Sequence, residues 1–341
     1  MPANLTPEYK AAQAAFRKAR DLRERLDCLR EMLRVIPKHK GTDHLQGDIK
    51  RRIKEFSEEL ERPKKSGARG GPPLVVQPEG AAQIALLGPP NTGKSSLHAR
   101  LTGSGAQAAP YPFTTQYPEP GMMPYEDIHF QLVDLPAVSP EHPVSWLASV
   151  LQMADACLLV VDLGDPACVE RLEALQAVLR EKRVTLTDRC QPEAEAAKRE
   201  SEADEDPFAL RLPTVLLVNR ADLLADVDTE LRAFLELTGL RYPAIAVSAN
   251  TGRGLGEIGP LLFSQLGIVR VYTKVPGRPP SRERPFALRR GQTVDDVARL
   301  VHKDLARSLK YARVWGKSGF DGQHVGREHR LEDCDVVELH A

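Results

Sequence analysis

The sequence predicts an α/β protein whose central part is a doubly wound parallel sheet. Within residues 82–266, short apolar runs alternate with longer stretches that have helical periodicity. Several of these runs end in glycine, asparagine, aspartate or serine, at the point where parallel strands meet a functional edge. The segments before and after this part have different patterns, so we expect an additional module at each end of the chain.

The first apolar run, at residues 84–87, opens into the sequence GPPNTGKSS. It matches G-x-x-x-x-G-K-[ST] between a strand and a helix, which predicts a P-loop NTPase (Ras-like) domain rather than a turn with an incidental lysine. Lys94 would reach the β- and γ-phosphates, and the Ser95 hydroxyl would bind Mg²⁺. The loop's candidate nucleotide-binding residues are Gly88, Asn91, Thr92, Gly93, Lys94, Ser95 and Ser96.

The composition is that of a globular protein with several domains. The chain has 341 residues, of which 42% are hydrophobic and 28% charged. No apolar run approaches the ~20 residues of a membrane span, and no apolar signal core is present at the N-terminus. We therefore expect a cytoplasmic protein with no membrane partner. The five cysteines form no C-x-x-C pair, which favours reduced packing thiols over disulfides or zinc.

The zero net charge conceals an uneven distribution along the chain. Residues 1–70 hold 18 lysines and arginines against 11 acidic residues, and residues 268–341 hold 15 against 10. The part between them has 14 basic and 26 acidic residues. Basic flanks indicate contact with a polyanion such as RNA, or equally well solvated helix faces that pair with the acidic middle. No aromatic-rich RNA-binding motif decides between the two.

Two apolar stripes predict an N-terminal helical hairpin over residues 1–64. The first stripe lies within 22–36 and ends at Pro37, and the second lies within 45–60. Because a hairpin of this size has a small core, we expect it to dock on the rest of the chain or on a protein partner. Residues 65–80 are rich in proline, glycine and basic residues and are interpreted as a linker.

The P-loop domain is predicted to span residues 81–267. Further strands are expected at 128–133, 157–161, 215–218 and 244–247, and helices at 144–153, 168–182, 227–238 and 255–266. Residues 103–120 contain too many prolines for regular structure and are interpreted as a nucleotide-sensing switch loop. The polar and acidic residues at about 188–207 are interpreted as a disordered insertion.

Motifs after the last two strands favour guanine over adenine. NRAD follows one strand at 219–222, and SAN follows the next at 248–250. The Asp222 carboxylate can accept hydrogen bonds from guanine N1–H and its exocyclic amine, whereas leaving it buried and unpaired against adenine would cost on the order of a few kcal/mol. Asn219 would tie this base loop to the phosphate loop. The candidate base-binding residues are Asn219, Arg220, Asp222, Ser248, Ala249 and Asn250.

The C-terminal residues 268–341 predict a small α+β module. Strands are expected at 269–272, 286–288, 312–315 and 336–339. A helix at 293–309 would place Val294, Val297, Val301 and Leu305 on its inward face.

Taken with the motifs above, YPFTT at 111–115 and DLPA at 134–137 make the chain resemble the Obg class of translation-factor-related GTPases. The stretches KHKGTDHLQGDIKRRIKEF, VRVYTK and GQTVDDVARLVHKDLARSLKYARVWGKS are most similar to the developmentally regulated GTP-binding (DRG) family. The C-terminal stretch resembles a TGS domain, a ubiquitin-like β-grasp module. The resemblance implies that Thr115 binds Mg²⁺ and senses the γ-phosphate, that Asp134 binds Mg²⁺ through water, and that the partner is the ribosome or its RNA.

Two residues depart from the pattern expected for rapid hydrolysis. Ala137 stands where the family has glycine, and Val138 stands where Ras-like enzymes have the glutamine that orients water. Because valine cannot polarise water, hydrolysis is expected to be slow or assisted from elsewhere. Asn91 occupies the position where some related GTPases hold K⁺, although an asparagine in a loop turn is an equally good interpretation.

The sequence thus predicts a switch that binds GTP and GDP and hydrolyses GTP slowly. The catalytic candidates are Lys94, Thr115 and Asn91, and the candidate metal ligands are Ser95, Thr115 and Asp134. The alternative is a degenerate nucleotide-binding scaffold for RNA or protein, in which hydrolysis is vestigial. A third option is an ATPase, for which Asp222 would be dispensable. The oligomeric state and the cellular process are left open.

Overall fold

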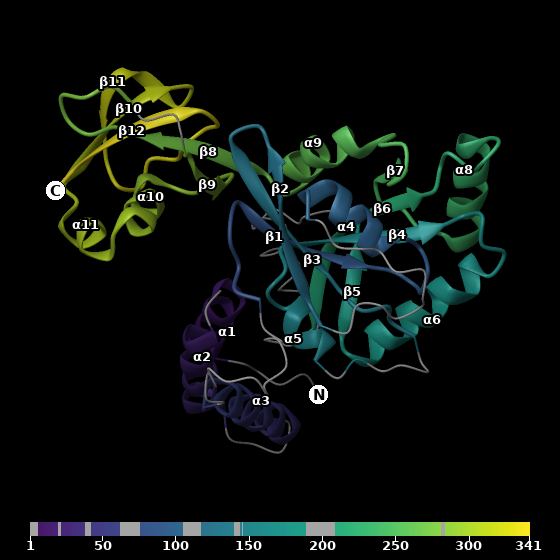
Figure 1. Ribbon diagram of the computed structural model, residues 1–341. Coiled ribbons are helices and arrows are strands. Elements are labelled where there is room, and N and C mark those ends of the chain that lie inside the picture. Colours follow the sequence, from purple (N-terminus) through teal and green to yellow (C-terminus); the bar gives the residue numbers. More distant parts are fainter. Residues whose placement is uncertain are drawn as a thin grey trace, which may run out of the picture. The chain divides into compact units, whose positions relative to one another are not determined.

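The computed structural model in Figure 1 describes residues 6–19, 22–37, 42–61, 76–104, 117–139, 144, 146–188, 209–280 and 284–341. The chain divides into two compact units. The first comprises Met1–Pro73 and Gln191–Ala209, and the second comprises Leu74–Cys190 and Leu210–Ala341. The described part of the first unit is helical, and the second unit contains both sheets.

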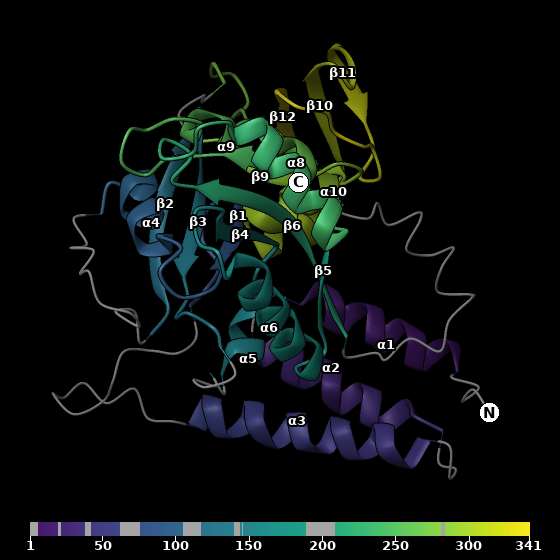
Figure 2. The same ribbon diagram turned by 90° about the vertical axis from the view of Figure 1, so that its right-hand side faces the viewer.

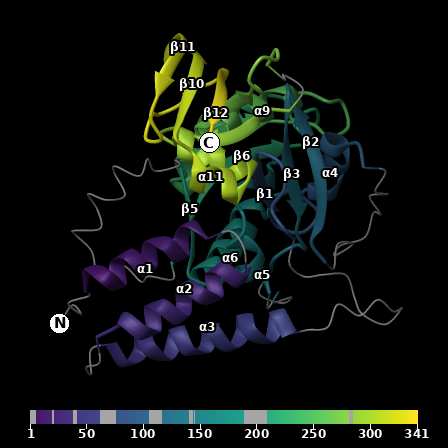
Figure 3. The ribbon, with the colours of Figure 1, turned by 90° about the vertical axis from the view of Figure 1, so that its left-hand side faces the viewer.

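Three helices pack side by side in the first unit (Figures 2 and 3): α1 (Pro7–Lys18), α2 (Leu22–Val35) and α3 (Asp43–Glu61). The apolar stripes predict α2 and α3, and their deepest residues include Leu29 and Ile49. The sequence pattern does not reveal α1, because its large buried residues, Tyr9 and Phe16, are separated by alanines and polar residues. The third helix gives this unit more core than two helices could provide.

The second unit begins with a mainly parallel sheet. Its described strands are β1 (Ala82–Leu87), β2 (Glu119–Tyr125), β3 (Ile128–Asp134), β4 (Ala156–Asp162), β5 (Val184–Thr187), β6 (Leu210–Asn219) and β7 (Ala244–Ala246). They are ordered β2-β3-β1-β4-β6-β5, and β7 pairs with the C-terminal part of β6. Neighbouring strands are parallel, except that β2 runs antiparallel to β3.

Helices cover both faces of this sheet. They are α4 (Lys94–Thr102), α5 (Leu147–Leu151), α6 (Cys168–Glu181), α8 (Val227–Thr238) and α9 (Leu255–Gln265). Ile84 and Leu86 of β1 pack into the core formed with α4 and α9, whereas Ala85 and Leu87 pack into the core formed with α5, α6 and α8. Strands buried on both faces need continuous apolar runs, as the sequence has. The predicted doubly wound α/β fold is confirmed.

Strand β2 corrects the expectation that residues 103–120 lack regular structure throughout. It begins at Glu119 and contains Pro120 and Pro124. Proline has no N–H to donate, so within a sheet it is tolerated at an edge, and β2 is an edge strand. The sequence pattern also does not predict β5, a four-residue strand that pairs with the N-terminal part of β6.

The C-terminal part of the second unit forms a separate five-stranded sheet of order β11-β10-β12-β8-β9. Its elements are β8 (Ile268–Thr273), β9 (Phe286–Arg289), α10 (Val294–Val301), α11 (Lys303–Ser308), β10 (Tyr311–Gly316), β11 (Gly319–Val325) and β12 (Asp335–His340). Only β8 and β12 pair in parallel; the other neighbours are antiparallel. Residues of α10 and α11 pack against one face and enclose the module's core.

The single helix predicted at 293–309 is wrong in one respect, because the chain breaks at His302. This residue has extended backbone angles, φ −166° and ψ 138°, and separates α10 from α11. Val294 and Val297 are buried as expected, but Val301 is 39% exposed. The periodicity of one continuous helix therefore does not apply beyond the end of α10.

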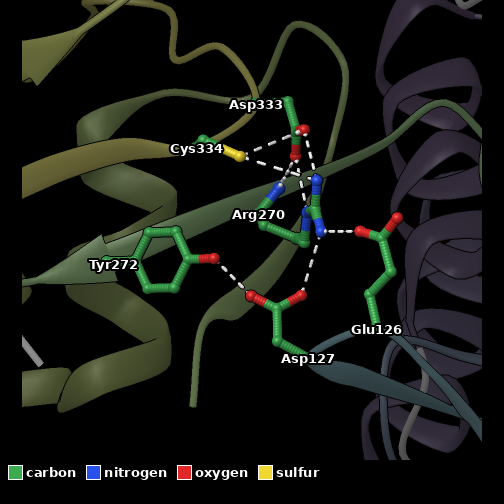
Figure 4. Close-up of polar contacts among 6 residues, drawn as sticks. All are labelled: Glu126, Asp127, Arg270, Tyr272, Asp333 and Cys334. Atoms are coloured by element: carbon green, nitrogen blue, oxygen red, sulfur yellow. Dashed lines mark hydrogen bonds and ion pairs between the residues drawn. The ribbon is translucent and has the colours of Figure 1, made fainter. Parts of the chain in front are cut away.

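Strand β8 joins the two sheets without a linker, since Ile268 packs in the first core and Val269 in the second. The next residue, Arg270, links the same parts through its side chain (Figure 4). Its Nε and Nη2 donate to the two carboxylate oxygens of Asp333 at 3.0 and 2.8 Å. Its Nη1 donates to Asp127, in the turn between β2 and β3, at 3.0 Å.

Two further contacts support this junction. The Tyr272 hydroxyl also donates to Asp127, and Arg289 of β9 forms an ion pair of 2.9 Å with Asp155. Asp127 directly precedes β3, and Asp155 directly precedes β4. The C-terminal module therefore contacts the edge of the central sheet at which these parallel strands begin.

Asp333 provides a test of the Arg270 interaction by its titration. Partial burial alone would raise the pKa of Asp333, but the hydrogen bonds and positive charge of Arg270 outweigh it and lower the pKa to about 2. The unfolded chain has the ordinary value of about 3.9. The resulting stabilisation is fully present above about pH 5 and is lost as the pH falls from about 4 to 2.

We predict that Asp333→Asn lowers the free energy of unfolding by about 1–2 kcal/mol at neutral pH. The difference from wild type should shrink between about pH 4 and 2, because the wild-type carboxylate then becomes protonated. Urea denaturation over this pH range measures it, with the exposed Asp321→Asn as control. A difference that stayed constant down to the lowest pH would contradict the proposed role of Arg270.

Candidate functional site

Two glycines allow the loop between β1 and α4 to pass close to the ends of other strands. Gly88 has φ +159°, and a Cβ there would lie 2.3 Å from the carbonyl oxygen of Val160 in β4. Gly93 has φ +82°, and a Cβ there would lie 2.3 Å from Nδ2 of Asn219. The loop thus curls over the carboxyl end of β4, with helix α4 beginning at Lys94.

Lys94 is 6% exposed and turns back onto the loop. Its Nζ donates to the carbonyl oxygens of Gly88 and Pro89 at 3.0 and 2.9 Å. Burial lowers the pKa of Lys94 to about 8, although the nearby Asp134 acts in the opposite direction. A phosphate group beside this ammonium would supply the negative charge that favours its protonated form.

Ser95 and Asp134 bring two oxygen donors together at the carboxyl edge of the sheet. Ser95 follows Lys94 in the first turn of α4, and Asp134 ends β3 and is 1% exposed. The Ser95 hydroxyl donates to Oδ2 of Asp134 at 2.6 Å. A hydroxyl beside a carboxylate fits the oxygen preference of Mg²⁺, which commonly binds through one or two protein ligands together with phosphates and water.

Asn219, at the end of β6, connects three loops. Its Nδ2 donates to the carbonyl oxygen of Thr92 in the phosphate loop at 2.8 Å. Its Oδ1 accepts from the backbone N–H of Ala249, after β7, at 3.3 Å. Asn219 is 2% exposed, so both bonds are shielded from water. One amide side chain therefore holds the NRAD loop, the SAN loop and the phosphate loop together.

The two charged residues of the NRAD loop have different environments. Arg220 adopts φ +57° and forms an ion pair of 2.6 Å with Asp162, at the end of β4. Asp222 is exposed, which corrects the expectation of a carboxylate already buried by the protein. The energetic argument against adenine therefore applies only when a bound base covers Asp222.

The SAN loop is stabilised by hydrogen bonds of Ser248 to residues that follow it in the chain. Ser248 is completely buried, and its hydroxyl accepts from the Thr251 N–H at 3.1 Å. Its own N–H donates to the Arg253 carbonyl oxygen at 3.0 Å. Ala249 is half-buried and Asn250 is exposed, so exposure to solvent increases from Ser248 to Asn250 in the loop beside Asn219.

The other predicted residues of the phosphate loop and the start of α4 differ in their exposure. Asn91 is exposed with φ +62°, and Ser96 is half-buried. Thr92 is buried, and its hydroxyl donates to the Pro89 carbonyl oxygen at 3.1 Å. Thr115 lies outside the described residues, as does the acidic insertion predicted at about 188–207 apart from Asp188.

Val138, at the position where Ras-like enzymes have glutamine, packs in the hydrophobic core. It is 1% exposed and belongs to the core that contains Leu135 and Leu147. Ala137 beside it is 6% exposed. The Val138 side chain therefore contributes to packing and offers no polar group to a water molecule at the carboxyl edge of the sheet.

Asp162 is a residue of this edge that the sequence motifs do not include. It is 7% exposed, pairs with Arg220 and accepts from the Gly164 N–H at 3.0 Å. Its position after an apolar run is the same signal that identifies Asp134. Within the described residues, no cluster of three metal-ligating side chains is present and no helix is long and apolar enough to cross a bilayer.

Comparison with known proteins identifies two families in the chain. The family described as 50S ribosome-binding GTPase matches residues 83–189, which contain the phosphate loop and Asp134. The TGS domain family matches residues 269–341. The chain is therefore a protein with a GTPase-family P-loop domain and a C-terminal TGS domain.

Relatives match almost the whole chain. A GTP-binding protein of Methanocaldococcus jannaschii is 28% identical, with 93% of this chain and 92% of the relative covered. Developmentally-regulated G-protein 2 of Arabidopsis thaliana is 28% identical, with 93% and 90% covered. Human developmentally-regulated GTP-binding protein 2 is 25% identical, with 93% and 98% covered. The predicted similarity to the DRG proteins is thus confirmed.

Comparing alanine substitutions at Gly93 and Gly103 separates the cost of a steric clash from the cost of a positive φ angle. Gly93→Ala should displace the Asn219 amide and lower the free energy of unfolding by about 3 kcal/mol or more, as measured by urea denaturation. Gly103 at the end of α4 has φ +68° but nothing within 4 Å of the place that a Cβ would take, so Gly103→Ala should cost about 1–2 kcal/mol. Equal losses would show that contact with Asn219 does not constrain position 93.

Proposed function

We propose that this protein is a GTP-dependent switch that binds GTP and GDP with Mg²⁺, hydrolyses GTP slowly, and docks on the ribosome or its RNA. The observation that carries the proposal is the pair of hydrogen bonds made by Asn219. It joins a phosphate-binding loop to a base-binding loop at one edge of the sheet. The match to a GTPase family supports guanine-nucleotide chemistry at that edge.

The phosphates would be held by the backbone N–H groups of the loop from Gly88 to Gly93 and by the N-terminus of α4. Lys94 would contribute its ammonium group to the β- and γ-phosphates. Ser95 and Thr115 would bind Mg²⁺ directly, and Asp134 would bind it through water. When bound, Mg²⁺ neutralises phosphate charge, and the residues of the loop position the γ-phosphate for attack by water.

Guanine would be recognised beside Asn219. The Asp222 carboxylate would accept from N1–H and the exocyclic amine, and the backbone of Ser248 and Ala249 would face the guanine oxygen. Arg220 and Asn250 border the same place. The exposure of Asp222 supports this role, because a base can reach its carboxylate from solvent.

Slow hydrolysis follows from the burial of Val138 in the core. The chain must then stabilise the transition state by other means. Asn91, exposed on the phosphate loop, would hold a K⁺ ion that supplies positive charge. Lys94 and Thr115 complete the proposed catalytic set.

The partner proposal uses both ends of the chain. One basic module is the helical unit of residues 1–64, in which α1 packs with the predicted hairpin of α2 and α3. The other is the TGS domain of residues 268–341. A linker at 65–80 and the GTPase domain at 81–267 lie between them in the sequence. The description of the matched GTPase family supports a ribosomal partner. The hairpin would also offer a surface to a partner protein, and the site of action would be the cytoplasm.

The second candidate function is a nucleotide-binding scaffold with vestigial hydrolysis. The observation that favours it is Val138, since a buried valine leaves the position of the water-orienting residue without a polar group. Both functions need GTP binding, so only hydrolysis separates them.

Asp222→Ala tests guanine recognition. We predict that GTP affinity falls about 100-fold, because two hydrogen bonds to a charged acceptor are lost, whereas ATP affinity stays unchanged. Competition against a fluorescent guanine nucleotide measures both. Asp228→Ala, an exposed carboxylate in α8, is the control and should bind GTP as wild type does. Unchanged GTP affinity in Asp222→Ala would refute the assignment of the base loop.

Single-turnover hydrolysis tests the switch against the scaffold. We predict faster GTP hydrolysis in K⁺ than in Na⁺, further stimulation by ribosomes, and loss of the K⁺ effect in Asn91→Ala with GTP affinity retained. Phosphate release from radiolabelled GTP is the measurement. Absence of stimulation under every condition would favour the scaffold.

A further inference from the structure

Within the described residues of the C-terminal module, α10 and α11 pack on one face of the sheet and not on the opposite face. Along β10, Ala312 and Val314 point into the core beneath α10 and α11 and are completely buried. Successive residues of a strand point to opposite faces, so Tyr311, Arg313 and Trp315 lie on the other side. Figure 1 shows α10 and α11 together on one side of this sheet. We call the opposite side the outer face.

Aromatic rings from three strands stack on the outer face. The ring of Tyr311 lies between His324 of β11, at 4.1 Å, and His340 of β12, at 4.4 Å, as measured between ring centroids. The interplanar angles are 21° and 9°, so the three rings are nearly parallel. His324 is exposed, and it stands at one end of the stack.

A second flat group lies further along the same strand. The ammonium of Lys274 sits 4.2 Å from the centre of the Trp315 ring, a cation–π arrangement. Lys274 also pairs with Glu338 at 3.3 Å, which in turn contacts His340 at 2.7 Å. Glu338 is 4% exposed, so these contacts fix the cation and the ring without leaving a strong negative charge at the surface.

Arg313 supplies exposed positive charge between the two aromatic groups. It lies opposite His324 on β11 and opposite Glu338 on β12. Arg313 is exposed and makes no ion pair within the described part of the chain. The module as a whole has an excess of five basic residues. The outer face therefore combines flat rings with a cation that is available to a polyanion.

We propose that the outer face of the TGS sheet is a binding site for unpaired nucleotides of RNA, an inference that rests on the proposed RNA partner. His324 would offer a ring face on which a base stacks, and Arg313 would contact the adjacent phosphate. Stacking on aromatic groups together with backbone charge is the general mode of single-strand recognition on sheets. An acidic protein surface would satisfy Arg313 but would make no use of the exposed ring.

The sequence does not reveal this site, because its residues form no motif. They come from β10, β11, β12 and the residue that follows β8, and are spread over residues 274–340. The antiparallel register places Tyr311 opposite His340 and Arg313 opposite His324. The sequence has no aromatic-rich RNA-binding motif beside its basic residues, but strand pairing brings separate aromatic residues together on this face.

Fluorescence anisotropy of the full chain tests the proposal, with a labelled single-stranded oligoadenylate and a duplex RNA of equal length. His324→Ala is expected to weaken single-strand binding about tenfold, and His324→Phe should restore it because the flat ring is kept. Arg313→Ala should weaken binding and lower the slope of log affinity against log salt by about one. Arg307→Ala on α11, whose side chain is 83% exposed, is the matched control and should have no such effect.

The outcomes separate this inference from the proposed function. If wild type binds RNA but His324→Ala and Arg313→Ala bind as well as wild type, the outer face is not the site and the RNA partner stands. Equal losses on duplex and single strand would overturn stacking. A loss of ribosome co-sedimentation alone, without any loss of RNA affinity, would assign the face to a protein. If wild type binds neither RNA, the RNA partner and this inference both fail, while GTP binding remains testable by itself.

Discussion

The proposed nucleotide site at the carboxyl edge of the central sheet depends on how the phosphate loop crosses the end of β4. Strand β4 lies between β1 and β6, so the loop that leaves β1 must bend over it before Asn219 can reach the Thr92 carbonyl oxygen. The close approaches of Gly88 to Val160 and of Gly93 to Asn219 are two consequences of that bend. A side chain at either glycine would lift the loop from the strands. The spacing of the two glycines in the sequence therefore reflects the spacing of three strands in the sheet.

The sequence predicts this edge well because parallel strands place their carboxyl ends together. Asp134, Asn219 and Ser248 are far apart in the chain, but each directly follows a buried strand or ends it. Other properties depend on side-chain conformation, which periodicity does not encode. The exposure of Asp222 and the pairing of Arg220 with Asp162 are examples. Strand β2 and the break at His302 escape prediction for another reason, since each follows from tertiary context that overrides a local pattern.

The contacts to the TGS module and the proposed nucleotide site lie at opposite ends of the same strands of the central sheet. Strand β3 has Asp127 just before its start and Asp134 at its end, and β4 likewise lies between Asp155 and Asp162. The starting carboxylates contact Arg270 and Arg289 of the TGS module, whereas the terminal ones lie at the nucleotide edge. Strand β8 follows α9 without a linker. The TGS module is therefore connected to the proposed nucleotide site by strands and ion pairs and not by a flexible segment. The module is thus held by the same strands whose carboxyl ends form the proposed nucleotide site.

The ion pairs also change how the charge of the C-terminal module is understood. Arg270 and Arg289 pair with acidic residues of the central domain, as an intramolecular interpretation of the basic flank requires. Arg327 pairs within the module with Asp295. These arginines are paired with carboxylates of the same chain and cannot account for affinity to a polyanion. Arg313 differs because it lies on β10, opposite His324 of β11 and opposite Glu338 of β12, and Glu338 already pairs with Lys274. The two interpretations of the basic flank therefore apply to different residues: the arginines of β8 and β9 pair with the central domain, whereas Arg313 of β10 does not.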